Sequence, residues 1–258
     1  MPTNRGECIP LLRPGQLHLW TARTDDLNDG TIASRVAGIL TADERDEARR
    51  FHRARDRHQF VVARALARLA LSHHFPVPAG DWRFARDHNR KPFIAAPEIS
   101  PPVRFSVSHT QGLVACLITL CAQAAVDVEK VEPSGDLPLV ASQVLSPAEQ
   151  GALSVLSGND WTARFFDYWT LKEAYAKARG LGLGLTLSDV AFELASDDTI
   201  RVHFAAAIND DPSAWVFWRR RLPPQHTISV AAEKDFDGEC ELILRPVKFD
   251  GARIAPEA

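Results

Sequence analysis

The sequence predicts an α+β protein built from two similar halves. Two matching helix starts are the first indication, because residues 41–44 and 146–149 each place a hydroxyl residue at the N-cap and a glutamate three positions later. In both places a helical stretch and then short, alternating strands follow. The length of 258 residues suits one large domain or two smaller ones. We therefore expect an N-terminal half over residues 1–123 and a C-terminal half over residues 124–258.

In the N-terminal half, alternation of apolar and polar residues predicts a first strand over 16–22. An arginine-rich helical segment follows from the capping box to residue 74, and Pro76 and Pro78 end it. Residues 81–102 contain four prolines and a turn at Asn89, so we expect little regular structure there. Two strands then follow, over 103–108 and 113–120.

The C-terminal half opens with a predicted strand over 125–131 and a polar linker over 132–138. After the second capping box, a helix over 161–179 is expected to end at Gly180. Five further strands are predicted over 190–194, 200–204, 214–220, 226–231 and 242–246.

Composition excludes several classes of protein. The net charge is −3, which does not support whole-molecule attraction to nucleic acid. The longest apolar run, fifteen residues over 112–126, is shorter than the ~20 residues of a membrane span. The first ten residues lack the pattern of a secretion signal, and the four cysteines show no metal-binding spacing. We expect a cytoplasmic protein with neither a nucleic-acid nor a membrane partner.

Two carboxylates share one face of the strand over 125–131. Asp127 and Glu129 are two residues apart, so their backbone positions are roughly 6–7 Å from each other. Two acids beside apolar neighbours are costly unless water, a basic side chain such as Lys130, or a divalent cation compensates them. With Glu173 as a third oxygen donor, the set would suit Mg²⁺.

Glu173 and Lys177 are four residues apart on the predicted helix and therefore lie on one face. Taken alone, such a pair is usually a surface ion pair worth a few tenths of a kcal/mol. Arg64 and Arg68 could clamp a phosphate, but they could equally be part of a solvated face balanced by nearby acids. The glycine-rich stretch 180–184 follows a predicted helix, whereas the glycine-rich loop of a nucleotide-binding motif precedes one. We therefore do not expect this stretch to bind a nucleotide.

Three segments occur in an order that is specific when taken together: SVSHTQG, AAVDVEK and WTLKEAYAKARGLGL. This order resembles the 4′-phosphopantetheinyl transferases, in particular their larger, surfactin-synthetase-activating subgroup. The resemblance covers roughly residues 40–190 and includes the turn at 89–92. Two family glycines are replaced, by Ala125 and Arg90. The resemblance implies a monomer with two similar halves related by a pseudo-two-fold axis and an active site in the cleft between them.

The resemblance also implies roles for individual residues. Asp127, Glu129 and Glu173 match the Mg²⁺ ligands, Glu173 is the candidate base, directly or through a bound water, and Lys177 is the candidate acid. Residues that match positions binding coenzyme A are Arg55, Arg64, Lys91, Ser108, His109, Lys172 and Lys177.

The implied activity is that of a holo-[carrier protein] synthase. Phosphopantetheine would pass from coenzyme A to a serine of an acyl or peptidyl carrier protein, releasing adenosine 3′,5′-bisphosphate. Two alternatives remain: a non-catalytic module that binds coenzyme A or a nucleotide, and another Mg²⁺-dependent phosphotransferase or phosphohydrolase.

Overall fold

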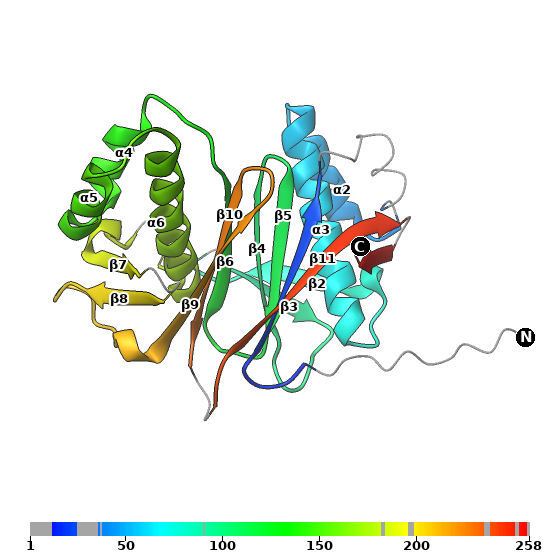
Figure 1. Cartoon of the computed structure of the whole chain (residues 1–258). Helices are drawn as coiled ribbons and strands as arrows, with labels where there is room; N and C mark the ends of the chain where they lie inside the picture. Colours follow the sequence, from blue (N-terminus) through cyan, green and yellow to red (C-terminus); the bar gives the residue numbers. More distant parts are fainter. Residues whose placement is uncertain are drawn as a thin grey trace, which may run out of the picture.

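The computed structural model describes residues 12–24, 36, 38–89, 91–181, 184–195, 199–234, 238–250 and 253–256. Two β-sheets lie side by side in the centre of the molecule, and each carries its helices on the side away from the other sheet (Figure 1). Arg90, whose replacement of a family glycine was noted above, is outside the described residues. Among the described residues, the structure contains no helix with the length and apolar character needed to span a membrane.

The N-terminal part of the chain forms a first strand, a short and a long helix, and two antiparallel hairpins. Its elements are β1 (Gln16–Arg23), α2 (Ala42–Arg49), α3 (Ala54–His74), the 3₁₀ turn η1 (Ala79–Asp81), β2 (Arg83–Arg86), β3 (Pro92–Ala96), β4 (Arg104–Thr110) and β5 (Leu113–Thr119).

The remainder repeats this order of strands, with α4 and the 3₁₀ turn η4 as further elements among the described residues, and then adds two strands. Its elements are β6 (Ala124–Lys130), α4 (Leu137–Val144), α5 (Pro147–Ser154), α6 (Gly158–Arg179), η3 (Leu187–Asp189), β7 (Val190–Leu194), β8 (Ile200–Phe204), η4 (Pro212–Ala214), β9 (Trp215–Leu222), β10 (His226–Glu233), β11 (Glu241–Asp250) and β12 (Arg253–Pro256).

The sheet topology confirms two similar halves. In the first sheet β1 pairs with β5, and β5 pairs with β4. In the second sheet β6 pairs with β10, and β10 pairs with β9. In each half the first strand thus pairs with the fifth, and the fifth pairs with the fourth. All four of these pairings are antiparallel.

The expected division of the chain needs one correction. β11 runs parallel to β1 and pairs with it from Gln16↔Glu241 to Ala22↔Val247, and β12 pairs with β11. Residues 241–256 therefore complete the N-terminal sheet, although they follow the C-terminal half in sequence. A parallel pairing between distant segments leaves no local turn signal, so the sequence did not indicate it.

Both predicted capping boxes are present, and in each of them the glutamate also forms a buried ion pair with a basic side chain. Thr41 and Ser146 accept hydrogen bonds from the backbone N–H groups of Glu44 and Glu149. Arg68 Nη2 lies 2.9 Å from Glu44 Oε2. The corresponding contact in the second half joins Lys172 Nζ and Glu149 Oε2 at 2.8 Å. Each pair fixes the start of a short helix against the long helix that follows.

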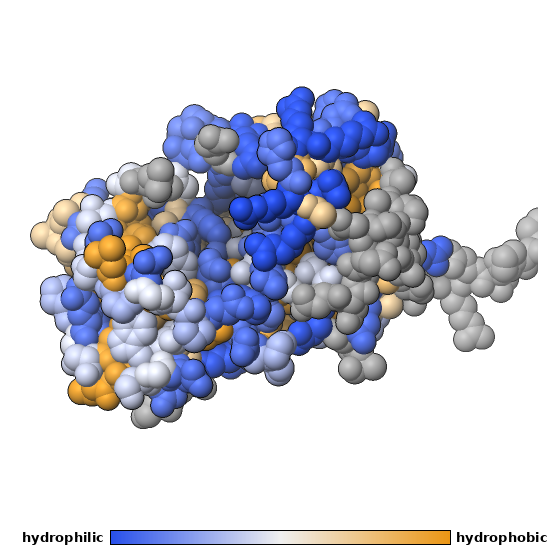
Figure 2. Space-filling view, turned by 90° about the horizontal axis from the view of Figure 1, so that it is seen from above, coloured by the Kyte–Doolittle hydropathy of each residue, from blue (hydrophilic) through white to orange (hydrophobic). Residues whose placement is uncertain are grey.

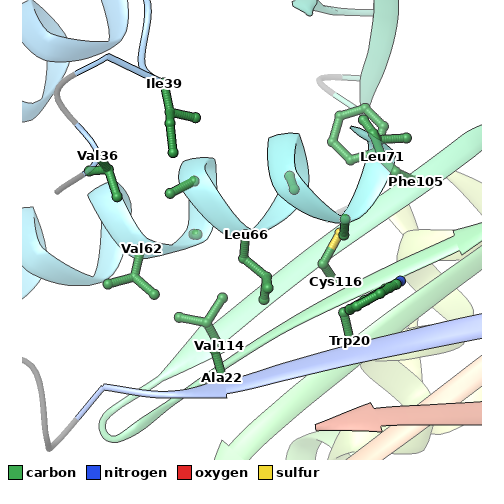
Figure 3. Close-up of a cluster of buried hydrophobic side chains, with 14 of the residues drawn as sticks. Trp20, Ala22, Val36, Ile39, Val62, Leu66, Leu71, Phe105, Val114 and Cys116 are labelled. Carbon is green, nitrogen blue, oxygen red and sulfur yellow. The ribbon is translucent and has the colours of Figure 1, made fainter. Parts of the chain in front are cut away.

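The core of the first half lies between α3 and its sheet. Val62 and Leu66 point from α3 toward the strands that carry Ala22, Val114 and Cys116 (Figure 3). These five side chains are all buried. α3 is therefore fixed as a rigid support behind the strand β4, which reaches the site described below.

Three local expectations differ from the structure. The helical segment up to residue 74 is interrupted at residues 50–53, between α2 and α3. The proline-rich stretch contains the hairpin β2–β3. The linker over 132–138 ends inside α4, which starts with a proline in its first turn. In the hairpin, partly buried Phe84 and Ile94 pack against the first core, and this tertiary contact outweighs the weak local strand signal.

Candidate functional site

A row of hydroxyl groups joins the two sheets where β4 runs beside β6. These strands belong to different sheets, yet they are in close contact. Ser106, Ser108 and Thr110 alternate along β4 and accept the backbone N–H groups of residues 126, 128 and 130, at 3.3, 3.3 and 3.2 Å. Each hydroxyl group thus takes the place of a backbone carbonyl as the acceptor of a β6 N–H group. These bonds hold β4 against β6, the strand that carries Asp127 and Glu129.

Asp127 lies at the centre of a compact polar group. Ser108 Oγ donates to Asp127 Oδ1 at 2.9 Å, and Lys177 Nζ lies 2.5 Å from the same oxygen. Lys177 Nζ also donates to Ser108 Oγ at 3.3 Å. β4, β6 and α6 each contribute one member, so three elements from both halves of the chain position this group.

Glu129 is held one step further along β6. Thr110 Oγ1 donates to Glu129 Oε2 at 3.3 Å, and the nearby Trp169 side chain also favours the ionised form of this carboxyl group and so opposes the rise of its pKa. Burial, with a further contribution from the negative charge of Asp127, raises the pKa of Glu129 from 4.5 to about 6. Burial and the neighbouring charge of Asp127 thus both favour the neutral form of Glu129.

Glu173 is partly buried on the face of α6 that packs against β6. Burial raises its pKa, the charge of Asp127 raises it further, and Lys177 opposes the shift. Glu173 and Lys177 therefore both lie on α6 close enough to Asp127 to interact with its charge, and they are not an isolated surface pair.

The raised pKa of Glu129 has a consequence for stability. A carboxyl group whose pKa is higher in the folded than in the unfolded chain destabilises the fold once it is ionised. The destabilisation is absent below pH 4.5 and complete above about pH 6. We expect Glu129→Gln to unfold at a higher temperature than the wild type near pH 8, with a difference that shrinks as the pH falls from 6 toward 4.5. Thermal unfolding across this range checks it, and a pH-independent difference would contradict it.

A groove leads from the polar group toward α2 and α3. Near α6 it is lined by Asn89, Lys91, Lys177 and Gly180. At its other end it is lined by Arg64, Arg86 and His109 among others, and Pro92, Phe105 and Val107 border both parts. Seen from above, hydrophilic side chains gather where the surface is hollowed between the two halves (Figure 2). Such a groove offers basic side chains along walls that are partly apolar.

Lys91 connects the groove to the end of α6. Its Nζ donates to the backbone carbonyl of Ala178 at 2.9 Å. Burial lowers the pKa of Lys91, and the charge of Arg104 lowers it further. An anion in the groove would compensate this repulsion between two cations.

Two predicted residues lie elsewhere than expected. Arg55 Nη1 donates to Gln111 Oε1 at 3.1 Å at the tip of the β4–β5 hairpin, and the side chain does not line the groove described above. The proposed phosphate contact of Lys172 is contradicted, because its side chain is 0% exposed and its ammonium group contacts Glu149 and the carbonyls of Leu187 and Val190. The spacing of the helix motif does not reveal that this lysine points into the core.

Residues that were not among the predicted site residues complete the site. Thr110 donates to Glu129, the Trp169 side chain lies near the same carboxylate, and Arg86 lines the groove beside Arg64. A signal for the first was available, because hydroxyl residues at alternate positions of a strand share one face. Arg86 gave no such signal, since it lies in the hairpin that the sequence did not predict.

The fit of the three acids to a divalent cation depends on their arrangement and on their free oxygen atoms. No group of three or more histidine, cysteine, aspartate or glutamate side chains in the described part of the chain is arranged to hold a metal ion, so the three carboxylates do not form a ready-made cluster. Asp127 Oδ2, however, is buried and has no hydrogen-bond partner. Mg²⁺ usually takes one or two carboxylates and completes its shell with water and substrate phosphates. An orphaned carboxylate oxygen beside the raised-pKa Glu129 fits that requirement.

Comparison with known proteins identifies the class. Residues 123–231 match the model of the 4′-phosphopantetheinyl transferase superfamily, and residues 30–120 match that of the 4′-phosphopantetheinyl transferase N-terminal region. A phosphopantetheinyl transferase of Thraustochytrium sp. is 30% identical over 233 residues, covering 85% of this chain and 80% of that protein.

Two bacterial relatives give the same result. The 4′-phosphopantetheinyl transferase HetI of Nostoc sp. is 29% identical over 74% of this chain and 80% of its own length. Sfp of Bacillus subtilis is 25% identical over 81% of this chain and 89% of its own length. The chain belongs to the 4′-phosphopantetheinyl transferase superfamily, and within it to the larger, Sfp-like subgroup. It is thus a transferase enzyme, as the three sequence segments together predicted.

Proposed function

We propose that this protein is a holo-[carrier protein] synthase that transfers the 4′-phosphopantetheine group of coenzyme A to a serine of an acyl or peptidyl carrier protein. Adenosine 3′,5′-bisphosphate is the second product. The observation that carries the proposal is the contact of Ser108, Asp127 and Lys177 at the end of a basic groove. A nucleotide in the groove would present its pyrophosphate to Lys177 and to a cation held by Asp127.

The groove supplies recognition of the nucleotide part of coenzyme A. Lys91 and Arg64 lie at its two ends and would pair with phosphate groups. Phe105 and Val107 border both ends and give apolar contact to the planar part of the ligand. His109 shares the cavity of Arg64 and would add a hydrogen bond there.

Asp127 and Glu129, with Glu173 nearby, would hold Mg²⁺. The bound ion would neutralise charge that develops on the pyrophosphate oxygens. Glu173 would accept the proton of the attacking serine, directly or through a bound water, and its raised pKa would make it a stronger base than an ordinary carboxylate. The Lys177 ammonium group would donate a proton to the leaving phosphate.

The acceptor would approach from the opposite end of α6. A second cavity of about 460 Å³ lies there, lined by Thr162 and Ala163 near the helix start and by Val131, just beyond the end of β6. The nucleotide groove lies at the other end of the helix, beside Gly180. A carrier domain seated over this cavity would approach the polar group from the side of α6 away from the nucleotide groove.

Lys177 gives a direct test of acid catalysis. We expect Lys177→Gln to lower kcat by about 10²-fold or more, because the leaving phosphate loses its proton donor and a fixed positive charge. Steady-state kinetics at saturating coenzyme A measure this value. Lys177→Arg, which retains the charge, should keep a larger share of the rate, and an unchanged kcat in Lys177→Gln would remove this residue from the mechanism.

Product analysis distinguishes the proposal from its alternatives. With an apo carrier protein, coenzyme A and Mg²⁺, chromatography should show adenosine 3′,5′-bisphosphate accumulating in step with carrier modification. Release of inorganic phosphate would favour another phosphotransferase or phosphohydrolase. Binding of coenzyme A with no product would favour the non-catalytic module.

A further inference from the structure

The hydroxyl row on β4 performs two separable tasks. The first is structural, and it is common to Ser106, Ser108 and Thr110, each of which accepts one backbone N–H group of β6. The second is limited to two of them, since only Ser108 and Thr110 also donate to a carboxylate. This difference separates joining the sheets from orienting the acids.

Ser108 has no hydrogen-bonding capacity left for a substrate. A serine hydroxyl offers one donor and two acceptor positions. Its donor is used on Asp127 Oδ1, and its two acceptor positions take the N–H group of Val128 and the ammonium group of Lys177. The side chain is also buried. A phosphate oxygen could accept a bond from Ser108 only if Asp127 released it.

Thr110 repeats this arrangement two residues later. Its hydroxyl donates to Glu129 Oε2 at 3.3 Å and accepts the N–H group of Lys130 at 3.2 Å. Because side chains at alternate strand positions share a face, the spacing of the two hydroxyls matches the spacing of the two acids. Each carboxylate thus has its own hydroxyl group.

We propose that Ser108 and Thr110 are positioning residues, which orient Asp127 and Glu129 toward a divalent cation, and that the Ser108 side chain is not a ligand of coenzyme A. The inference rests on the proposed function only in assigning a cation to these acids. It replaces the role that the family resemblance implied for Ser108. Donor groups behind metal ligands typically change metal affinity by about 10- to 100-fold when removed.

The test measures metal binding without turnover. Mn²⁺ is titrated into the full-length chain and followed by electron paramagnetic resonance, with Mg²⁺ as competitor. We expect Ser108→Ala and Thr110→Val each to raise the Mn²⁺ dissociation constant by about tenfold or more. Thr110→Ser, which retains the hydroxyl, should restore most of the affinity. The KM for coenzyme A should change less than about twofold in Thr110→Val.

Ser106→Ala is the matched control, because it also removes an acceptor of a β6 N–H group but has no carboxylate to orient. Its Mn²⁺ affinity should stay within about twofold of wild type, whatever the change in stability. An equal loss in Ser106→Ala would show that the row acts only by joining the sheets, and the proposal would be overturned. It would also be overturned by no Mn²⁺ binding in the wild type, or by a Ser108→Ala variant that binds Mn²⁺ normally and only weakens coenzyme A.

These experiments distinguish failure of the proposed transferase function from failure of the positioning roles. If the wild type modified no carrier but the variants lost Mn²⁺ affinity as described, the transferase proposal would fail while the positioning roles would stand. If carriers were modified and the variants bound Mn²⁺ normally, the positioning roles would fail while the transferase proposal would stand.

Discussion

Asp127→Asn should lower kcat/KM for carrier modification by about 10³-fold or more while leaving the fold intact. Asp127 is buried, accepts a hydrogen bond from Ser108 and pairs with Lys177, so its charge holds both of these side chains in place. Asparagine keeps the shape but removes the negative charge that would bind the cation. Losing a preorganised electrostatic group in an active site typically costs about 10²–10³-fold in rate, and here a metal ligand is lost as well.

The measurement is kcat/KM together with circular dichroism and thermal unfolding, which establish that the variant is folded. Asp136→Asn is a suitable control, because Asp136 is an exposed acid at the start of α4 and lines none of the cavities described above. Wild-type turnover in Asp127→Asn would exclude this acid from the site.

Lys172→Met should destabilise the protein by about 3–5 kcal/mol without a specific effect on coenzyme A binding. Lys172 and Glu149 are both fully buried and form an ion pair, so removing the cation leaves an uncompensated buried charge. Glu149 also accepts the N–H groups of Ser146 and Phe192, which ties this charge to both α5 and β7. The effect should appear in urea unfolding, with the KM for coenzyme A unchanged in the folded fraction.

A second variant keeps this prediction testable if Lys172→Met folds poorly. The double variant Lys172→Met with Glu149→Gln removes both charges and should recover part of the lost stability. If Lys172→Met were as stable as the wild type and instead raised the KM for coenzyme A, the phosphate-binding role that the family resemblance implied would be restored.

The internal repeat explains why Lys172 resembles a functional residue but is structural. Arg68 occupies the corresponding position in α3 and makes the corresponding contacts, to Glu44 and to the carbonyls of Ala79 and Trp82. The first half has no acidic side chain at the position of Asp127, so Arg68 can only stabilise the capping-box glutamate Glu44. Lys172 stabilises Glu149 in the same way and is therefore a structural residue.

The repeat also shows which residues occupy the positions of the site in the first half. Asp127 faces the fourth residue of β10, and Trp20 faces the fourth residue of β5, so they occupy equivalent positions. Counting from Arg68 and Lys172, His73 is equivalent to Lys177. Trp20 and His73 make a ring contact at 4.9 Å where the other half has an ion pair. An aromatic contact thus stabilises the first half where charged chemistry is possible in the second.

Local patterns predicted much of this structure. Both capping boxes, the Gly180 helix end with φ 66° and the strand positions that carry Asp127 and Glu129 are encoded within a few residues and are confirmed. The β1–β11 pairing and the groove depend on contacts between distant segments, which no local pattern records. The sequence also did not predict the direction of every side chain. The motif spacing placed Lys172 on the helix, but it did not show that this side chain would point inward and pair with Glu149.

The most direct test of the central claim is intact-mass spectrometry of an apo carrier protein incubated with this protein and coenzyme A, with Mg²⁺ or with EDTA, and with wild type or Asp127→Asn. The account predicts a mass increase of one phosphopantetheine group only with wild type and Mg²⁺. An equal increase with EDTA or with Asp127→Asn would contradict the acid site as the centre of the reaction. No increase on any of several carrier types, despite bound coenzyme A, would contradict the transferase itself.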